Sequence, residues 1–170
     1  MRLVEGSADV ADVDSFVASL ARIGDEHGVT VQALDARYVV SRAHLERAVE
    51  LAERAFDRGE NVARDRGVEI LLYAAGRRQI DRALTLGVSR GRNPVVVLID
   101  APDGDPDANE DEADAAAAVE ELLDPKPTLG SYDETRVREF FDVGDPELGA
   151  VDGDLADVVL ERVALLDVEK

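Results

Sequence analysis

The sequence predicts a single α/β domain, residues 1–170, with a small mixed β-sheet surrounded by helices. Segments with helical apolar spacing alternate along the chain with short β-branched segments. The length of 170 residues suits one compact domain with a core of its own, and no repeat or linker interrupts the pattern. The segment PVVVLI at 94–99 is apolar throughout, which is typical of a central strand.

The first half of the chain supplies two strands and two helices, each with local start and stop signals. An Asp or Ser marks the start of each helix, and a glycine marks its end. The predicted elements are an edge strand at 1–6, a helix to about His27 capped by Asp12 or Asp14 and ended by Gly28, a strand at 29–35, and an amphipathic helix at 42–58 between Ser41 and Gly59.

The second half begins with a polar connection at 61–66 and an apolar block at 69–75. A loop rich in Pro, Gly and Asp follows the central strand at 101–111, and we expect it to be solvated. The remaining predicted elements are a helix at 79–86 with Ile80, Ala83 and Leu84 facing inward, a helix at 112–123 stopped by Pro125, a helix at 133–141 capped by Asp133, and a terminal helix at 155–166.

Composition excludes several classes of site. The chain has 38 Asp and Glu against 19 Lys and Arg, a net charge of −19, and nearly all of its basic residues are arginine. An acid-rich, lysine-poor surface indicates a halophilic protein kept soluble by carboxylates. With no Cys and two His, we expect no disulfide, no metal site and no cofactor. The absence of an apolar span or signal pattern predicts a soluble, cytoplasmic protein without a membrane partner.

Motifs of common enzymes are absent from the sequence. It contains no phosphate-binding GxxxxGK[ST] or GxGxxG loop, no GxSxG elbow and no HExxH. His44 and Glu46 are two positions apart on a predicted helix and therefore point to different faces. We therefore expect a protein without intrinsic catalysis.

A basic segment interrupts the acidic chain between Arg54 and Arg92. It holds nine arginines and five acids, a balance of +4, whereas the rest of the chain carries −23. Within it, Gly76 permits a tight turn, and Arg77 and Arg78 follow at a predicted helix start, a natural place for a phosphate or carboxylate. Gln79 can bond a base edge and Tyr73 can stack on a base. Alternatively, these arginines only pair with nearby acids.

The terminal helix carries more apolar residues than one buried stripe requires. Such a helix is either fully buried or half buried with an interface on its other side, and we favour a protein-binding face. The residues assigned to this face are Leu155, Val159, Val163 and Leu166.

The stretch 61–87 resembles the small tRNA-recruiting subunit of the KEOPS complex, the family that includes PRPK-binding protein. The resemblance rests on Asn61 with Ala63, on the segment EILLY that begins at Glu69, on the GRRQI element at 76–80, and on Ala83 with Gly87. The strand at 94–99 and the C-terminal helix follow in the expected order. The acidic insert at 103–114 lies outside the resemblance.

The resemblance implies a non-catalytic role in tRNA modification. KEOPS installs threonylcarbamoyladenosine next to the anticodon, and this subunit binds the single-stranded 3′ CCA end of tRNA. It also docks on and activates a kinase-like ATPase subunit, through which it reaches the transferase subunit. Mapped onto this chain, the RNA-binding residues are Asn61, Arg64, Arg66, Leu72, Tyr73, Gly76, Arg77, Arg78 and Gln79, and the terminal helix is the kinase-docking face.

Other functions fit part of the same pattern. The turn at Gly76–Arg78 also suits a small enzyme or binding protein for a phosphorylated metabolite. A purely structural subunit would use the arginines for internal ion pairs. The terminal helix would also serve a homodimer formed when the partner is absent.

Overall fold

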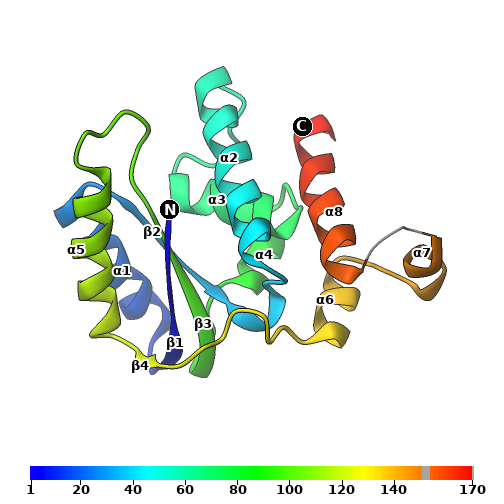
Figure 1. Cartoon of the computed structure of the whole chain (residues 1–170), viewed down its shortest axis with the longest axis horizontal. Helices are drawn as coiled ribbons and strands as arrows, with labels where there is room; N and C mark the ends of the chain where they lie inside the picture. Colours follow the sequence, from blue (N-terminus) through cyan, green and yellow to red (C-terminus); the bar gives the residue numbers. More distant parts are fainter. Residues whose placement is uncertain (151–153, 170) are drawn as a thin grey trace. The chain divides into compact units, whose positions relative to one another are not determined.

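The structure, a computed structural model, describes residues 1–150 and 154–169. The chain divides into two compact units, each assembled from two stretches of sequence. The first, the sheet unit, contains Met1–Ala36 and Gly87–Thr128, and the second, the helical unit, contains Arg37–Leu86 and Leu129–Lys170. Every strand that the structure describes belongs to the sheet unit (Figure 1). The α/β fold class predicted from the sequence is confirmed.

The sheet has four strands in the order β2-β3-β1-β4, and all of these pairings are antiparallel, not mixed as predicted. The helix α1 (Val13–His27) connects β1 to β2, which run parallel to each other, but β3 lies between them and opposes both. Each neighbouring pair is therefore antiparallel. The strands are β1 (Arg2–Val10), β2 (Thr30–Asp35), β3 (Gly91–Asp100) and β4 (Asp124–Pro125).

The prediction that the first strand lies at a sheet edge is wrong. β1 pairs with β3 along its whole length, from Arg2 opposite Ile99 to Val10 opposite Gly91. On its other side, Gly6 and Ser7 pair with the two residues of β4. The predicted central position of the PVVVLI segment is confirmed, because β3 lies between β2 and β1.

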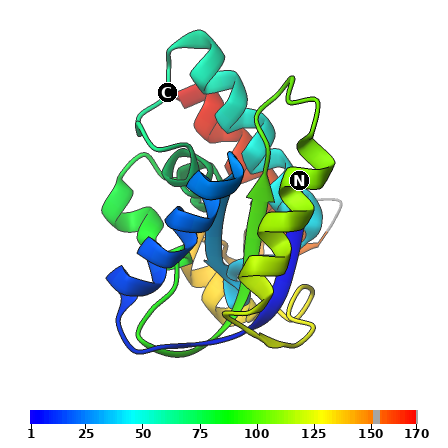
Figure 2. The same cartoon turned by 90° about the vertical axis from the view of Figure 1, so that its left-hand side faces the viewer.

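Two helices cover one face of this sheet, α1 and α5 (Ala108–Glu120) (Figure 2). Asp12 accepts a hydrogen bond from the Ser15 N–H at 3.1 Å, and Gly28 ends α1 with φ +67°. Both caps match the prediction. α5 begins four residues before the predicted start, because Glu110 and Asp111 fill its first turn and favour the positive end of the helix dipole. Val4, Val97, Leu20 and Val119 belong to the core that these elements enclose.

The helical unit is built around α2 (Arg42–Arg58), α3 (Arg66–Ala75) and α8 (Leu155–Glu169), and α8 packs against both of the other helices. Ser41 caps α2 and Asp133 caps α6, as predicted. The apolar block at 69–75 lies within α3. The remaining helices are α4 (Ile80–Ala83), the 3₁₀ helix η2 (Leu84–Leu86), α6 (Glu134–Phe140) and α7 (Asp145–Ala150), with a further 3₁₀ helix η1 (Ala36–Tyr38) at the border of the units.

The predicted helix at 79–86 is present in a tighter form, and its predicted inward face is confirmed for Ala83 but wrong for Ile80 and Leu84. Four residues of α4 are followed at once by η2, in which side chains three apart share a face. Ala83 and Leu86 are accordingly buried, whereas Ile80 is 43% exposed and Leu84 is 55% exposed. The apolar side chains at 80 and 84 therefore lie at the surface.

The imidazole of His44 is fully buried at the start of α2. Its Nε2–H donates to the carbonyl of Ala74 at 2.7 Å, and its Nδ1 accepts from the N–H of Val40 at 3.3 Å. Burial disfavours the charged ring and lowers the pKa of His44 from 6.5 to about 4, while the Ala74 carbonyl partly opposes this shift. His44 is therefore a neutral structural residue rather than a surface one.

The pKa of His44 predicts a loss of stability in mild acid. The unfolded chain binds a proton near pH 6.5 and the folded chain only near pH 4, so stability falls as pH decreases through that interval. We expect the free energy of unfolding to drop by about 2 kcal/mol from this residue between pH 7 and pH 5. Urea unfolding at pH 7 and at pH 5 measures this drop in the free energy of unfolding. If a His44→Asn variant showed the same pH dependence, His44 would not be its cause.

No helix in the described part of the chain is long and apolar enough to cross a membrane.

Candidate nucleic-acid interface

The turn between α3 and α4 depends on Gly76. This residue ends α3 in the left-handed region with φ +62°, and the N–H groups of Gly76 and Arg77 bond carbonyls of the last helical turn. A Cβ at position 76 would lie 3.4 Å from the carbonyl oxygen of Arg162 in α8. The tight turn expected at Gly76 is therefore present, and it packs against the backbone of α8.

Arg77 is held by the protein itself. Its guanidinium donates to the carbonyl of Phe140 at the end of α6, and its Cζ lies 5.1 Å from the centroid of the Phe140 ring. This pair of contacts joins the α3–α4 turn to α6 and fixes the backbone at Phe140. Arg77 is half-buried, so its remaining N–H groups stay close to the surface.

Arg78, Gln79 and Arg82 follow on the exposed surface of the same turn. Among the side chains that the structure describes, neither Arg78 nor Arg82 forms an ion pair with a carboxylate. Most arginines outside this turn, such as Arg66 and Arg136, do have such a partner. Arg78 in the turn and Arg82 in α4 therefore keep guanidinium groups that are available to an anion.

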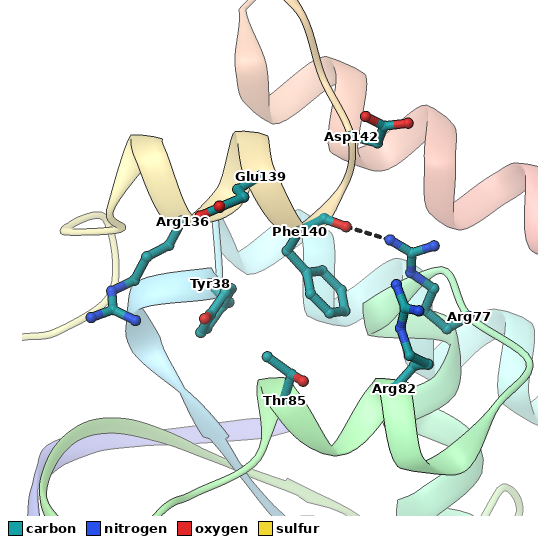
Figure 3. A pocket seen from close by; sticks show the side chains of 8 residues that line it. All are labelled: Tyr38, Arg77, Arg82, Thr85, Arg136, Glu139, Phe140 and Asp142. Atoms are coloured by element: carbon teal, nitrogen blue, oxygen red, sulfur yellow. Dashed lines mark hydrogen bonds between the residues drawn. The ribbon is translucent and has the colours of Figure 1, made fainter.

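A cavity of about 480 Å³ opens next to this turn (Figure 3). Tyr38 and Phe140 form an edge-to-face pair in it, with ring centroids 5.8 Å apart. The cavity lies wholly in the helical unit, and its lining combines aromatic rings, three arginines, two carboxylates and a hydroxyl: Tyr38, Arg77, Arg82, Thr85, Arg136, Glu139, Phe140 and Asp142. Such a lining suits a ligand with a planar ring and a phosphate.

Arginines from other elements fix the backbone carbonyls of two residues that line the cavity, Phe140 and Asp142, and of Phe141 between them. Arg162 of α8 donates to the carbonyls of Phe141 and Asp142, each at 3.2 Å, and pairs with Glu147 at 2.7 Å. Asp142 has φ +55°, a conformation that an aspartate tolerates better than most residues. Together with the Arg77 contact to Phe140, these bonds preform one wall of the cavity.

The predicted residues at 61–66 are organised by a buried carboxylate. Glu69 in α3 is fully buried, and its Oε1 accepts from the N–H groups of Val62 and Ala63, both at 3.0 Å. The Asn61 amide donates to the Ala63 carbonyl at 2.8 Å. The Asn-x-Ala block and the glutamate that follows it therefore form one hydrogen-bonded unit.

Arg64 and Arg66 lie at the other end of α3 from Arg77 and Arg78. Ten residues of helix separate the two ends, a distance of about 15 Å along the axis. Arg66 pairs with Glu53 of α2 at 2.7 Å, while Arg64 is exposed. The four arginines predicted to bind RNA therefore lie in two separate pairs, one at each end of α3, and do not form a single site.

The structure places Leu72 and Tyr73 in the interior of the helical unit. Both side chains are 0% exposed, and the Tyr73 hydroxyl donates to Asp167 of α8 at 3.3 Å. Neither side chain can reach a base in this arrangement. Tyrosine is scarce in this chain, but scarcity does not indicate whether the ring of Tyr73 lies at the surface or in the core.

The four residues predicted to form the docking face of the terminal helix are also buried, in its packing against α2 and α3. On the opposite side of α8, Leu165 is 41% exposed and Val168 is 79% exposed. The helix therefore has both a buried face and an exposed apolar strip, but the residues named from the sequence belong to the buried face: Leu155, Val159, Val163 and Leu166.

Sequence reasoning missed most of the cavity lining. Tyr38 and Phe140 are about 100 positions apart, and no spacing rule relates them. Arg82 was counted in the basic segment but was not chosen, and Arg136 and Thr85 carried no local signal. The only available clue was the rarity of aromatic residues, 4% of the chain.

No group of three or more His, Asp or Glu side chains is arranged to hold a metal ion among the residues that the structure describes. A family model described as kinase binding protein CGI-121 matches residues 8–167. A search of curated proteins finds no match to the chain.

Proposed function

Because the chain belongs to the kinase binding protein CGI-121 family, we propose that it is a non-catalytic subunit of the KEOPS complex, which makes threonylcarbamoyladenosine in tRNA. In this role it binds the 3′ CCA end of tRNA. It also docks on the kinase-like ATPase subunit and activates it, and through that subunit it reaches the threonylcarbamoyl transferase. The catalytic residues then belong to the partners.

The RNA half of the proposal rests on Arg82, which lines the aromatic cavity, and on Arg78, which lies in the turn between α3 and α4. Phosphate contacts supply most of the affinity for nucleic acid, and they require guanidinium groups that are not already neutralised. Single-stranded ends also expose bases that stack on aromatic rings. The α3–α4 turn and the Tyr38–Phe140 pair supply both kinds of contact within one unit.

A halophilic setting strengthens the need for short-range contacts. The acid-rich, lysine-poor composition favours such a setting. In molar salt the Debye length is about 3 Å, so long-range steering is lost and phosphate contacts weaken. Stacking depends less on salt than phosphate contacts do. In this proposal a base stacks on Tyr38 and Phe140 rather than on the buried ring of Tyr73.

For the kinase half, we assign docking to the exposed strip of α8, with Leu165 and Val168 as its apolar contacts. Exposed branched aliphatic side chains of this kind gain free energy when a partner covers them. The buried face of the same helix supports the strip by packing on α2 and α3.

One recruitment experiment tests both halves. The kinase-like subunit is immobilised, and labelled tRNA is added with this chain, without it, or as a transcript lacking the 3′ CCA. We expect retention only of intact tRNA and only when the chain is present. A Leu165→Asp, Val168→Asp variant should still bind tRNA in solution but lose retention. Equal retention of both transcripts would refute CCA recognition, and retention of the variant would refute the assigned docking strip.

A further inference from the structure

We propose that the cavity lined by Tyr38, Arg82 and Phe140 binds one nucleotide as a base-plus-phosphate unit, and that it selects a monophosphate over a triphosphate. The inference rests on the proposed RNA-binding function, because a single-stranded RNA end would present that nucleotide. It goes further by naming the residues that hold the base and those that hold the phosphate.

The size of the cavity suits one nucleotide. Its volume of about 480 Å³ falls within the range of small-ligand sites, about 300–1,000 Å³. Its aromatic wall is one edge-to-face pair, Tyr38 with Phe140, and Arg77 already lies over the Phe140 ring. The wall therefore has room for one planar base rather than a stack of several.

The arginines of the lining are not equivalent. Arg77 is committed to the Phe140 carbonyl, and Arg136 pairs with Asp133 at 3.3 Å. Arg82 forms no ion pair with a carboxylate in the part of the chain that the structure describes, and it lines the same cavity as Arg77 (Figure 3). Arg82 is therefore the principal phosphate ligand, and Arg77 positions the ring next to it.

The charge of the lining sets the preferred charge of the ligand. Three arginines and the two carboxylates Glu139 and Asp142 give a formal balance of +1. One phosphodiester group, with a single negative charge, matches that balance. A phosphomonoester carries nearly two negative charges, and a triphosphate brings still more close to both carboxylates. The same carboxylates accept hydrogen bonds from ribose hydroxyls or an exocyclic amino group. The cavity therefore distinguishes an RNA nucleotide from ATP.

The wall is rigid before any ligand arrives. Arg77 and Arg162 hold the backbone carbonyls of Phe140, Phe141 and Asp142 from two different elements. A preformed wall lowers the ordering cost of binding, which is the main penalty for a weakly held single nucleotide.

The test is a titration of the whole chain, followed by calorimetry or NMR, with four probes: 5′-AMP, adenosine, inorganic phosphate and ATP. We expect AMP to bind about tenfold tighter than adenosine or phosphate, and no weaker than ATP. Arg82→Gln should weaken AMP and phosphate but not adenosine. Phe140→Leu should weaken AMP about tenfold and leave phosphate unchanged, as expected for loss of one stacked base.

Matched controls lie in the sheet unit, where Arg22→Gln and Phe16→Leu change the same residue types and should leave all four affinities unchanged. Arg82 is exposed, so its variant tests the site even if Phe140→Leu unfolds. Equal affinity for AMP and phosphate, tighter binding of ATP, or no binding of AMP at millimolar concentration would each overturn the proposal.

The two proposals fail separately. If CCA-dependent recruitment of tRNA survives both Arg82→Gln and Phe140→Leu, the nucleotide cavity is wrong and the proposed function stands. If AMP binds as expected but the chain recruits no tRNA to the kinase-like subunit, the cavity stands and the proposed function is wrong.

Discussion

Replacing Arg78 and Arg82 together by glutamate is expected to abolish measurable tRNA binding while the protein stays folded. Both side chains are exposed, and within the described residues neither one pairs with a carboxylate, so the change removes no internal ion pair. It converts two attractive charges, one in the α3–α4 turn and one in the cavity lining, into two repulsive ones in a chain that already carries −19. Electrophoretic mobility shift with one intact tRNA measures the loss, which we expect to exceed a hundredfold.

The choice of positions matters for this experiment. Arg77 is the neighbouring candidate, but it holds the Phe140 carbonyl, so a loss of binding on its replacement would not separate contact from misfolding. A matched control is Arg2→Glu with Arg22→Glu, two exposed arginines in the sheet unit that change the net charge by the same amount. Equal loss in the control would show that net charge alone governs binding, and unchanged affinity in the test variant would exclude the α3–α4 turn.

Local signals in the sequence predicted local structure well. Asp12, Ser41 and Asp133 each cap the helix assigned to them, because a cap needs only a side-chain oxygen three residues before the amide that it binds. Gly28 ends α1 for an equally local reason, its positive φ. The central strand at 94–99 also followed from its own residues, since an all-apolar β-branched segment must be covered on both faces.

Except for the inward face of 79–86, which local 3₁₀ geometry changed, the failures concern partners that are distant in sequence. Nothing local shows that β3 separates β1 from β2, and this is what makes the sheet antiparallel. Whether an apolar residue faces the core or a partner depends on which helix packs beside it, so Val159 and Val163 could not be distinguished from Leu165 by spacing alone. The cavity depends on the contact between Tyr38 and Phe140. These residues are distant in sequence, and only folding brings their rings together.

The resemblance proposed a narrower segment for RNA binding than composition did, but it also merged two kinds of residue. Arg78 and Gln79 are exposed and available for contact, whereas Asn61 and Glu69 belong to one internal hydrogen-bonded unit. A sequence motif can contain residues that hold the backbone of a segment in place as well as residues that contact a ligand. The structure distinguishes them by burial and by hydrogen-bond partners.

The second large effect is expected from Glu69→Ala, which should lower the free energy of unfolding by about 3 kcal/mol. The carboxylate is fully buried and satisfies the N–H groups of Val62 and Ala63, which precede α3. Alanine leaves these two donors without their acceptor and leaves a cavity where the side chain was. Urea unfolding measures the loss, and hydrogen exchange should show weaker protection of the amides at 62 and 63.

Glu69→Gln separates the hydrogen bonds from the charge. Both amides donate to Oε1 at 3.0 Å, and the Val62 N–H also lies 3.2 Å from Oε2. A glutamine with its carbonyl oxygen in the place of Oε1 keeps the two shorter bonds and loses the longer one. We therefore expect glutamine to cost only about 1 kcal/mol, and Glu60→Ala, at an exposed position of the same connection, to cost less still. Equal losses for alanine and glutamine would mean that the negative charge, rather than the two hydrogen bonds, holds this segment. A loss below 1 kcal/mol for alanine would mean that the segment preceding α3 is held by other contacts.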